Sequence, residues 1–221
     1  LSGKISIGLF DEELDLLAAS DSAVKISLRN IGIGIAKGFT GGTTVAATLA
    51  LANNAGIKVF GTGGIGGVHR GNPFDISADL EALSQTPIVV VCAGAKAILD
   101  LPATLEALET RGIPVIGYQT NEFPAFYSRT SGLPVDCRVE NAKEIFEIAQ
   151  AHWSVGNRSG VLVCNPIPEA DALDASEVDR VVQQAIVEAG LTGISGAALT
   201  PFLLAKVSSA TGGKSLHANL A

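Results

Sequence analysis

The residues best suited to chemistry lie in one stretch of the chain, between Gly61 and Lys96. Five of the first seven residues of this stretch are glycines, which leaves the backbone bare. Bare N–H groups can wrap an anion, and glycine reaches the positive-φ conformations that such a loop needs. The polar residues that crowd the same segment are Thr62, His69, Arg70, Asp75, Ser77 and Asp79. This crowding predicts a ligand-binding loop; the alternative is a mobile surface loop.

Two apolar, β-branched runs, Ile57–Phe60 and Ile88–Cys92, predict buried strands before and after this loop. Each run ends in a glycine-bearing loop, and in open α/β sheets ligands bind outside the carboxyl ends of strands. Lys96 follows the second run, among small apolar residues. Most lysines are solvated, but a lysine buried at this point would have a lowered pKa and a nucleophilic amine.

A dinucleotide fingerprint is the competing interpretation of the glycine loop. The run from Gly61 to Gly66 matches G-x-G-x-x-G and follows a predicted strand. The third glycine should open a helix, but Gly67, Gly71 and Pro73 follow it. The sequence therefore argues against a nicotinamide-dependent dehydrogenase. A titration with the nicotinamide cofactor would test this, and we expect no binding.

Predicted strands alternate with predicted helices along the chain. Strands are expected at 4–9, 24–28, 57–60, 88–92, 114–117 and 160–164, and helices at 11–19, 45–54, 78–84, 100–110, 141–153, 174–189 and 200–212. Thr43 and Thr44 precede the helix at 45–54, where they suit a phosphate or an ordinary helix cap. The alternation predicts one α/β domain over residues 1–221, a three-layer α/β/α sandwich around a mixed, largely parallel sheet.

Composition narrows the class of protein. With 47% hydrophobic and 17% charged residues among 221, the chain is not disordered. A net charge of −7 argues against a nucleic-acid partner, although local donors could still bind a phosphorylated small molecule. The three cysteines lack metal-type spacing and suit a reducing, cytoplasmic compartment. We expect neither a membrane span nor a signal peptide, because no apolar run is long enough.

Several motifs, in order along nearly the whole chain, carry a resemblance to a known family. They are Gly-Gly-Thr-Thr-Val-Ala-Ala-Thr at 41–48, Thr-Gly-Gly-Ile-Gly-Gly-Val-His-Arg-Gly at 62–71, Phe-Asp-Ile-Ser-Ala-Asp at 74–79, Cys-Ala-Gly-Ala-Lys at 92–96, Val-Ile-Gly-Tyr at 115–118, Phe-Pro-Ala-Phe-Tyr at 123–127, Asn-Pro-Ile-Pro at 165–168 and Thr-Pro-Phe-Leu-Leu-Ala at 200–205. With these motifs the chain resembles the pseudouridine-5'-phosphate glycosidases, a family that includes the indigoidine synthase A-like proteins.

The resemblance implies a reaction. The family reversibly cleaves the C–C glycosidic bond of pseudouridine 5'-phosphate to give uracil and ribose 5-phosphate. Lys96 would attack C1′ of the sugar and form an imine with ring-opened ribose. This allows uracil, a poor leaving group because it is bonded through carbon, to depart. The same resemblance implies a homotrimer.

The resemblance also implies a set of substrate and metal contacts. Lys25 and Ser77 would hold the phosphate. Asp75 would bind Mn²⁺ or another divalent cation such as Mg²⁺, since both ions prefer oxygen ligands. Thr62, His69 and Asn219 would line the pocket for the base. The complete set of implied substrate contacts is Lys25, Val45, Thr62, His69, Ser77, Ala78, Asp79 and Asn219.

Some of these residues also have purely structural interpretations. Ser77 is placed to cap a helix, and Asp79 would sit in its first turn, where the helix dipole favours an acid. His69 could be an ordinary loop histidine. Asp75 lies just before the helix and has no comparable explanation.

One feature of the family has no match in this chain. The family carries an acid/base glutamate in an N-terminal segment, and Glu12 and Glu13 lie in a predicted helix that does not resemble it. The chain also stops shortly after Asn219, where the family continues with a helix. We therefore expect a domain incomplete at both ends. The second hypothesis is a catalytically inactive protein that binds sugar phosphates. A binding assay and a turnover assay together would distinguish it from the active glycosidase.

Overall fold

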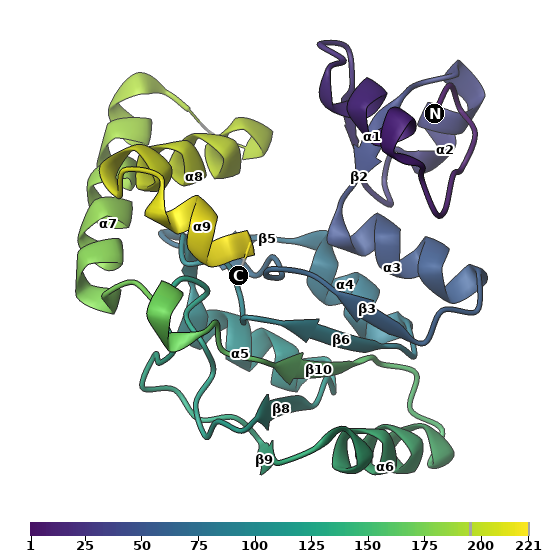
Figure 1. Cartoon of the computed structure of the whole chain (residues 1–221), viewed down its shortest axis with the longest axis vertical. Helices are drawn as coiled ribbons and strands as arrows, with labels where there is room; N and C mark the ends of the chain where they lie inside the picture. Colours follow the sequence, from purple (N-terminus) through teal and green to yellow (C-terminus); the bar gives the residue numbers. More distant parts are fainter. Residues whose placement is uncertain (195, 221) are drawn as a thin grey trace.

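A five-stranded sheet forms the centre of the molecule, shown in Figure 1 as a computed structural model that describes residues 1–194 and 196–220. The strand order is β3-β6-β10-β8-β9 and every neighbouring pair is parallel. The strands are β3 (Val59–Gly61), β6 (Val89–Cys92), β10 (Val161–Cys164), β8 (Val115–Tyr118) and β9 (Cys137–Val139). The inner strands β6, β10 and β8 are apolar and buried, as is typical of parallel strands covered on both faces. The edge strands β3 and β9 are largely exposed, so the run at 57–60 forms a strand as predicted but not a buried one.

Helices cover both faces of this sheet. Alternate side chains of each strand point to opposite faces, so Val161 and Val163 join one apolar cluster while Leu162 and Cys164 join another. The smaller cluster is closed by α6 (Ala142–Ser154), and the larger one by helices from the rest of the chain. The remaining helices of the main body are α3 (Val45–Asn54), α4 (Ala78–Gln85), α5 (Leu101–Thr110), η1 (Glu169–Asp171), α7 (Ala175–Thr192), η2 (Gly196–Ala198), α8 (Leu199–Ala210) and α9 (Lys214–Leu220). The predicted three-layer α/β/α fold is confirmed.

A small separate sheet is antiparallel. Its strand order is β5-β4-β7, with β4 (Val68–His69) between β5 (Asn72–Ile76) and β7 (Leu99–Asp100). His69 lies opposite Leu99, so the end of the glycine loop is fixed beside the segment that follows Lys96.

Residues 1–43 form a lobe at the upper right of Figure 1. It contains α1 (Asp11–Ala18), α2 (Ile31–Lys37) and a parallel pair of strands, β1 (Val24–Ile26) and β2 (Gly41–Thr43). The strand predicted at 4–9 is wrong, because Gly3 and Gly8 adopt φ angles of 77° and 78° that break an extended run.

The last helices form a layer at the left of Figure 1, and α9 reaches the edge of the sheet toward which β6 points. Helix α7 begins where predicted, because Asp174 caps it by accepting from Glu177 N at 2.9 Å. It ends at Thr192 and is closed by Gly193 rather than by Gly190, since Gly193 adopts the left-handed conformation that closes helices. Within the described residues, no helix is long and apolar enough to cross a membrane.

Candidate active site

The two glycine-bearing loops meet at the carboxyl ends of β3 and β6, as the sequence predicts. Ala93 N donates to Gly63 O at 3.0 Å, and Ile65 N donates to Gly94 O at 3.1 Å. Lys96 N then donates to Ile65 O, also at 3.1 Å. These bonds align the glycine loop with the segment that carries Lys96, so movement of one loop would displace the other.

The glycines of the first loop are required for close approach. None of the five between Gly61 and Gly67 has a positive φ, so that part of the prediction is wrong. Four of them face groups that a Cβ would strike, namely Gly63 with Asn219 Oδ1 at 2.3 Å, Gly64 with the Phe126 ring at 2.5 Å, Gly66 with Ser77 Oγ at 2.2 Å and Gly67 with Thr104 Oγ1 at 2.3 Å. The loop is therefore packed between four other segments of the chain.

The side chain of Asp79 binds one backbone N–H of this loop and one of α3. Its Oδ2 accepts from Gly66 N and its Oδ1 accepts from Ala46 N, both at 2.8 Å. Ala46 lies in the first turn of α3, where the helix dipole favours a negative charge. Asp79 is only 5% exposed, and its side-chain oxygens join α3 to the glycine loop. Its contact with substrate stays a prediction.

The caps of α3 and α4 follow the structural interpretations. Thr44 Oγ1 accepts from Ala47 N at 3.3 Å, and Ser77 Oγ accepts from Asp79 N at 3.2 Å. Because Ala46 N and Ala47 N already have protein acceptors, the first turn of α3 has fewer free N–H groups for a phosphate than the sequence suggests. The hydroxyl of Ser77 lies next to Gly66, at the N-terminus of α4.

Lys96 is half-buried beside two of the other predicted residues. Burial lowers the pKa of its amine below the ordinary value, the negative charge of Asp79 opposes this shift, and the positive charge of Lys25 adds to it. Lys25 comes from β1, so the N-terminal lobe contributes a cation to the neighbourhood of Lys96.

Val45 and Ala78 are the first residues of α3 and α4, the two helices whose first turns Asp79 joins.

An open pocket of about 540 Å³ lies at the same edge of the sheet. It brings together Thr62 and Asn219, as predicted, whereas His69 lies outside its lining, on β4. Asn165 also lines it, directly after β10 in the middle of the sheet. The sequence signal for Asn165 was its place after an apolar strand, which is the same signal that identified Thr62.

Asp75 lies on β5, two residues before the cap of α4, and not in a loop as predicted. Its side chain is half-buried. No group of three His, Cys, Asp or Glu side chains within residues 1–194 and 196–220 could hold a metal ion. Asp75 belongs to no such group, so a hard cation held there would keep much of its water.

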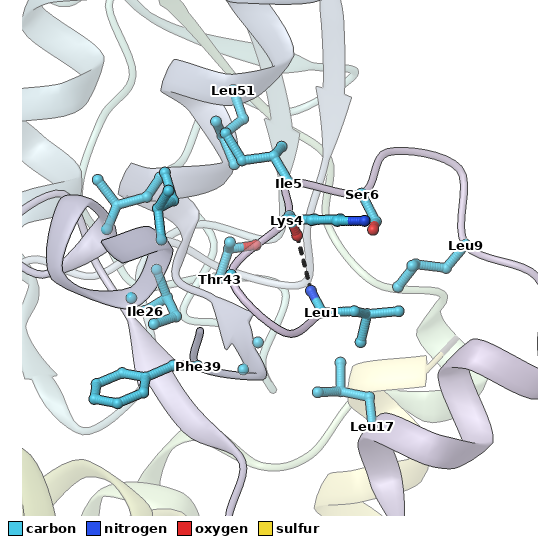
Figure 2. A pocket seen from close by; sticks show the side chains of 16 residues that line it. Leu1, Lys4, Ile5, Ser6, Leu9, Leu17, Ile26, Phe39, Thr43 and Leu51 are labelled. Carbon is cyan, nitrogen blue, oxygen red and sulfur yellow. Dashed lines mark hydrogen bonds between the residues drawn. The ribbon is translucent and has the colours of Figure 1, made fainter. Parts of the chain in front are cut away.

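A second, smaller pocket lies in the N-terminal lobe, and Thr43 is the one residue of its lining that the sequence suggested for phosphate binding. Figure 2 shows this pocket of about 140 Å³, in which Ile5, Leu9, Leu17 and Phe39 surround an apolar interior. Thr43 stands on its wall. Because its lining offers mainly apolar side chains, the candidate active site is the region around Lys96.

Comparison with known proteins places the chain in a family. The family model for indigoidine synthase A like proteins matches residues 1–221. Among curated relatives, the pseudouridine-5'-phosphate glycosidase of Caldanaerobacter subterraneus subsp. tengcongensis is 55% identical, over 100% of this chain and 72% of that protein. The protein of the same name from Clostridium botulinum is 52% identical, over 100% of this chain and 73% of its own length.

Solved structures agree with this placement. An indigoidine synthase A-like protein from Thermotoga maritima has a TM-score of 0.93 and 41% identity, covering 100% of this chain and 73% of that one. The prealnumycin C-glycosynthase AlnA, in complex with ribulose 5-phosphate, has a TM-score of 0.91 and 41% identity, covering 99% and 72%. The whole of the described chain therefore has the architecture of these proteins, and it belongs to the indigoidine synthase A-like family.

Proposed function

We propose that this chain reversibly cleaves the C–C glycosidic bond of pseudouridine 5'-phosphate, with water, to uracil and ribose 5-phosphate. The observation that carries the proposal is Lys96, a half-buried amine with a lowered pKa at the junction of two loops. The names of the close relatives support the substrate, and the ribulose 5-phosphate bound to AlnA supports a sugar-phosphate site.

Lys96 acts as the nucleophile of this reaction. Its neutral amine forms a bond to C1′, the C1′–O4′ bond of the ring breaks, and one amine proton moves to O4′. The C1′–C5 bond then breaks, the remaining N–H proton is delivered to C5 of uracil, and an imine is left at C1′. Water adds to the imine, which releases ribose 5-phosphate and restores the neutral Lys96.

Release of uracil from pseudouridine 5'-phosphate is the direct test. We expect uracil and ribose 5-phosphate in equal amounts, with affinity about 10- to 100-fold weaker for pseudouridine without its phosphate, as loss of one charge-assisted hydrogen bond implies. Lys25 and Ser77 motivate this expectation. Liquid chromatography would measure turnover and calorimetry the affinity. Binding without turnover would favour the inactive sugar-phosphate-binding alternative. Equal affinity for pseudouridine and pseudouridine 5'-phosphate would contradict the phosphate contact.

We also propose that Asp75 is the one protein ligand of a divalent cation, Mn²⁺ or Mg²⁺. Such an ion would supply positive charge to oxygen atoms of the substrate. A half-buried carboxylate and the preference of these ions for oxygen and water support the assignment.

Asp75→Asn is expected to abolish Mn²⁺ binding and any stimulation by Mn²⁺, with little change in the unfolding temperature. The amide keeps the shape of the side chain but loses the charge that holds a hard cation. Electron paramagnetic resonance of free Mn²⁺ would measure binding directly. Asp15→Asn, an exposed carboxylate on α1, is the matched control. Equal Mn²⁺ binding by the Asp75 variant and the unaltered chain would rule out the assignment.

A cytoplasmic setting and self-association complete the proposal. Cys92, Cys137 and Cys164 are all free, which supports a reducing compartment. The N-terminal lobe exposes several large apolar side chains, among them Phe10, which is 73% exposed. Apolar surface of this kind supports association between copies, including the trimer that the family resemblance implies.

A further inference from the structure

Arg70 binds the segment that follows Lys96. Its Nε donates to Leu99 O and its Nη2 donates to Ala97 O, both at 3.0 Å. Nη1 of the same guanidinium pairs with Asp179 Oδ1 on α7 at 2.5 Å. One rigid fork of donors is thus directed at two backbone carbonyls and one carboxylate, a pattern that a lysine cannot reproduce.

The two carbonyls belong to a tight turn that begins at Lys96. Leu99 N donates to Lys96 O at 2.9 Å and closes the turn, while Lys96 N is held by Ile65 O. Ala97 and Leu99 are both buried. The backbone of Lys96 is therefore fixed by the glycine loop before it and by the Arg70-bound turn after it.

Asp179 connects this turn to the C-terminal helices. It lies near the start of α7, which packs on α8, and α8 in turn contacts α9, the helix that carries Asn219. Asp179 is the more exposed partner, at 55% against 21% for Arg70. The exposed ion pair adds little stability by itself, but it fixes the orientation of the guanidinium.

On the basis of the function proposed above, we propose that Arg70 is a positioning residue for the reaction. It holds the turn that begins at Lys96 in the geometry from which the amine reaches C1′, and Asp179 orients Arg70. Nε and Nη2 of Arg70 bind the two carbonyls of this turn and Nη1 binds Asp179, so Arg70 acts on the reaction through the position of Lys96. Small displacements of a reacting group slow the chemical step far more than they weaken binding.

Arg70→Lys is expected to lower kcat about 10- to 100-fold and to leave KM nearly unchanged. The ammonium keeps the charge but cannot bind both carbonyls and Asp179 together. The rate at which borohydride traps ribose 5-phosphate on Lys96 should fall in parallel. Asp179→Asn keeps an oxygen toward Arg70 and loses only the charge, so its fall in kcat should be smaller and in the same direction.

Arg111→Lys is the matched control. Arg111 is similarly half-buried, with 25% of its side chain exposed; it donates to Ala107 O of α5, the helix that it follows, and pairs with Glu81 rather than with the turn after Lys96. The control should keep its kcat. An equal fall in the control, no fall in Arg70→Lys, or a change in KM alone would overturn the role of Arg70.

Unfolding temperatures, and trapping of ribose 5-phosphate by the unaltered chain, distinguish three outcomes: a variant that does not fold, a wrong proposed function and a wrong role for Arg70. If Arg70→Lys does not fold, Asp179→Asn decides, and a folded Asp179 variant with unchanged kcat and trapping rate would overturn the proposal. Failure of the unaltered chain to trap ribose 5-phosphate would overturn the proposed function and this role with it. Trapping at one rate in all variants would overturn only the role of Arg70.

Discussion

Lys96→Arg is expected to abolish turnover and borohydride trapping of ribose 5-phosphate while the fold is retained. Arginine keeps the positive charge and much of the length of lysine, but it is never a neutral amine in a protein. Without a neutral amine no imine forms, and loss of a nucleophile typically lowers kcat by at least about 10⁴-fold. Peptide mass mapping after reduction should place the adduct of the unaltered chain on the peptide that contains Lys96.

Lys37→Arg, on the exposed side of α2, is the control for this substitution and should trap normally. Labelling that survives Lys96→Arg would show that another amine reacts. Lys25 is the amine to examine first, because its charge already influences Lys96.

The pH dependence of trapping gives an independent check on Lys96. Burial lowers the pKa of its amine, so the neutral form accumulates at a lower pH than for a solvated lysine. Trapping should increase as pH rises through this lowered pKa. Lys25→Gln removes a nearby positive charge, which raises the pKa of Lys96 and moves the profile to higher pH. A profile that moves to lower pH would contradict the arrangement of these two lysines.

The parts of the fold that local sequence determines could be predicted. The apolar runs that became β3 and β6 were found because short runs rich in β-branched residues favour strands. Only β6 is buried as predicted, because β3 lies at the edge of the sheet, where Val59 is exposed. The start of α7 was found because the capping residue Asp174 and the residue whose N–H it binds, Glu177, are close together in the sequence. Lys96 was found for a related reason, since a lysine next to a buried strand is unusual on its own.

The contacts that organise the site could not be predicted in the same way. Arg70 binds Ala97, Leu99 and Asp179, which are separated from it by 27, 29 and 109 residues. Asp79 looks like an ordinary first-turn acid, yet its carboxylate binds two backbone groups outside its own helix. A sequence pattern records which residues are present near a loop, but it does not record which remote donor a carboxylate will meet.

Asp79→Ala is expected to lower the free energy of unfolding by about 2–6 kcal/mol, because it leaves two buried N–H groups without an acceptor at about 1–3 kcal/mol each. Urea unfolding would measure this loss. Ser77→Ala is the matched control, since it removes only a helix cap, which is worth about 1 kcal/mol. Hydrogen exchange should accelerate at the amides of Ala46 and Gly66 in the Asp79 variant, and not in the control.

The same substitution should also alter the chemistry of Lys96. Asp79 opposes the lowering of the Lys96 pKa, so its removal should lower that pKa further and move the trapping profile to lower pH, opposite to the effect of Lys25→Gln. The rate at high pH should nevertheless fall, because Gly66 loses the bond that anchors the loop aligned with Lys96. A variant as stable as the unaltered chain, with an unshifted profile, would show that Asp79 neither anchors α3 to the glycine loop nor acts on the lysine.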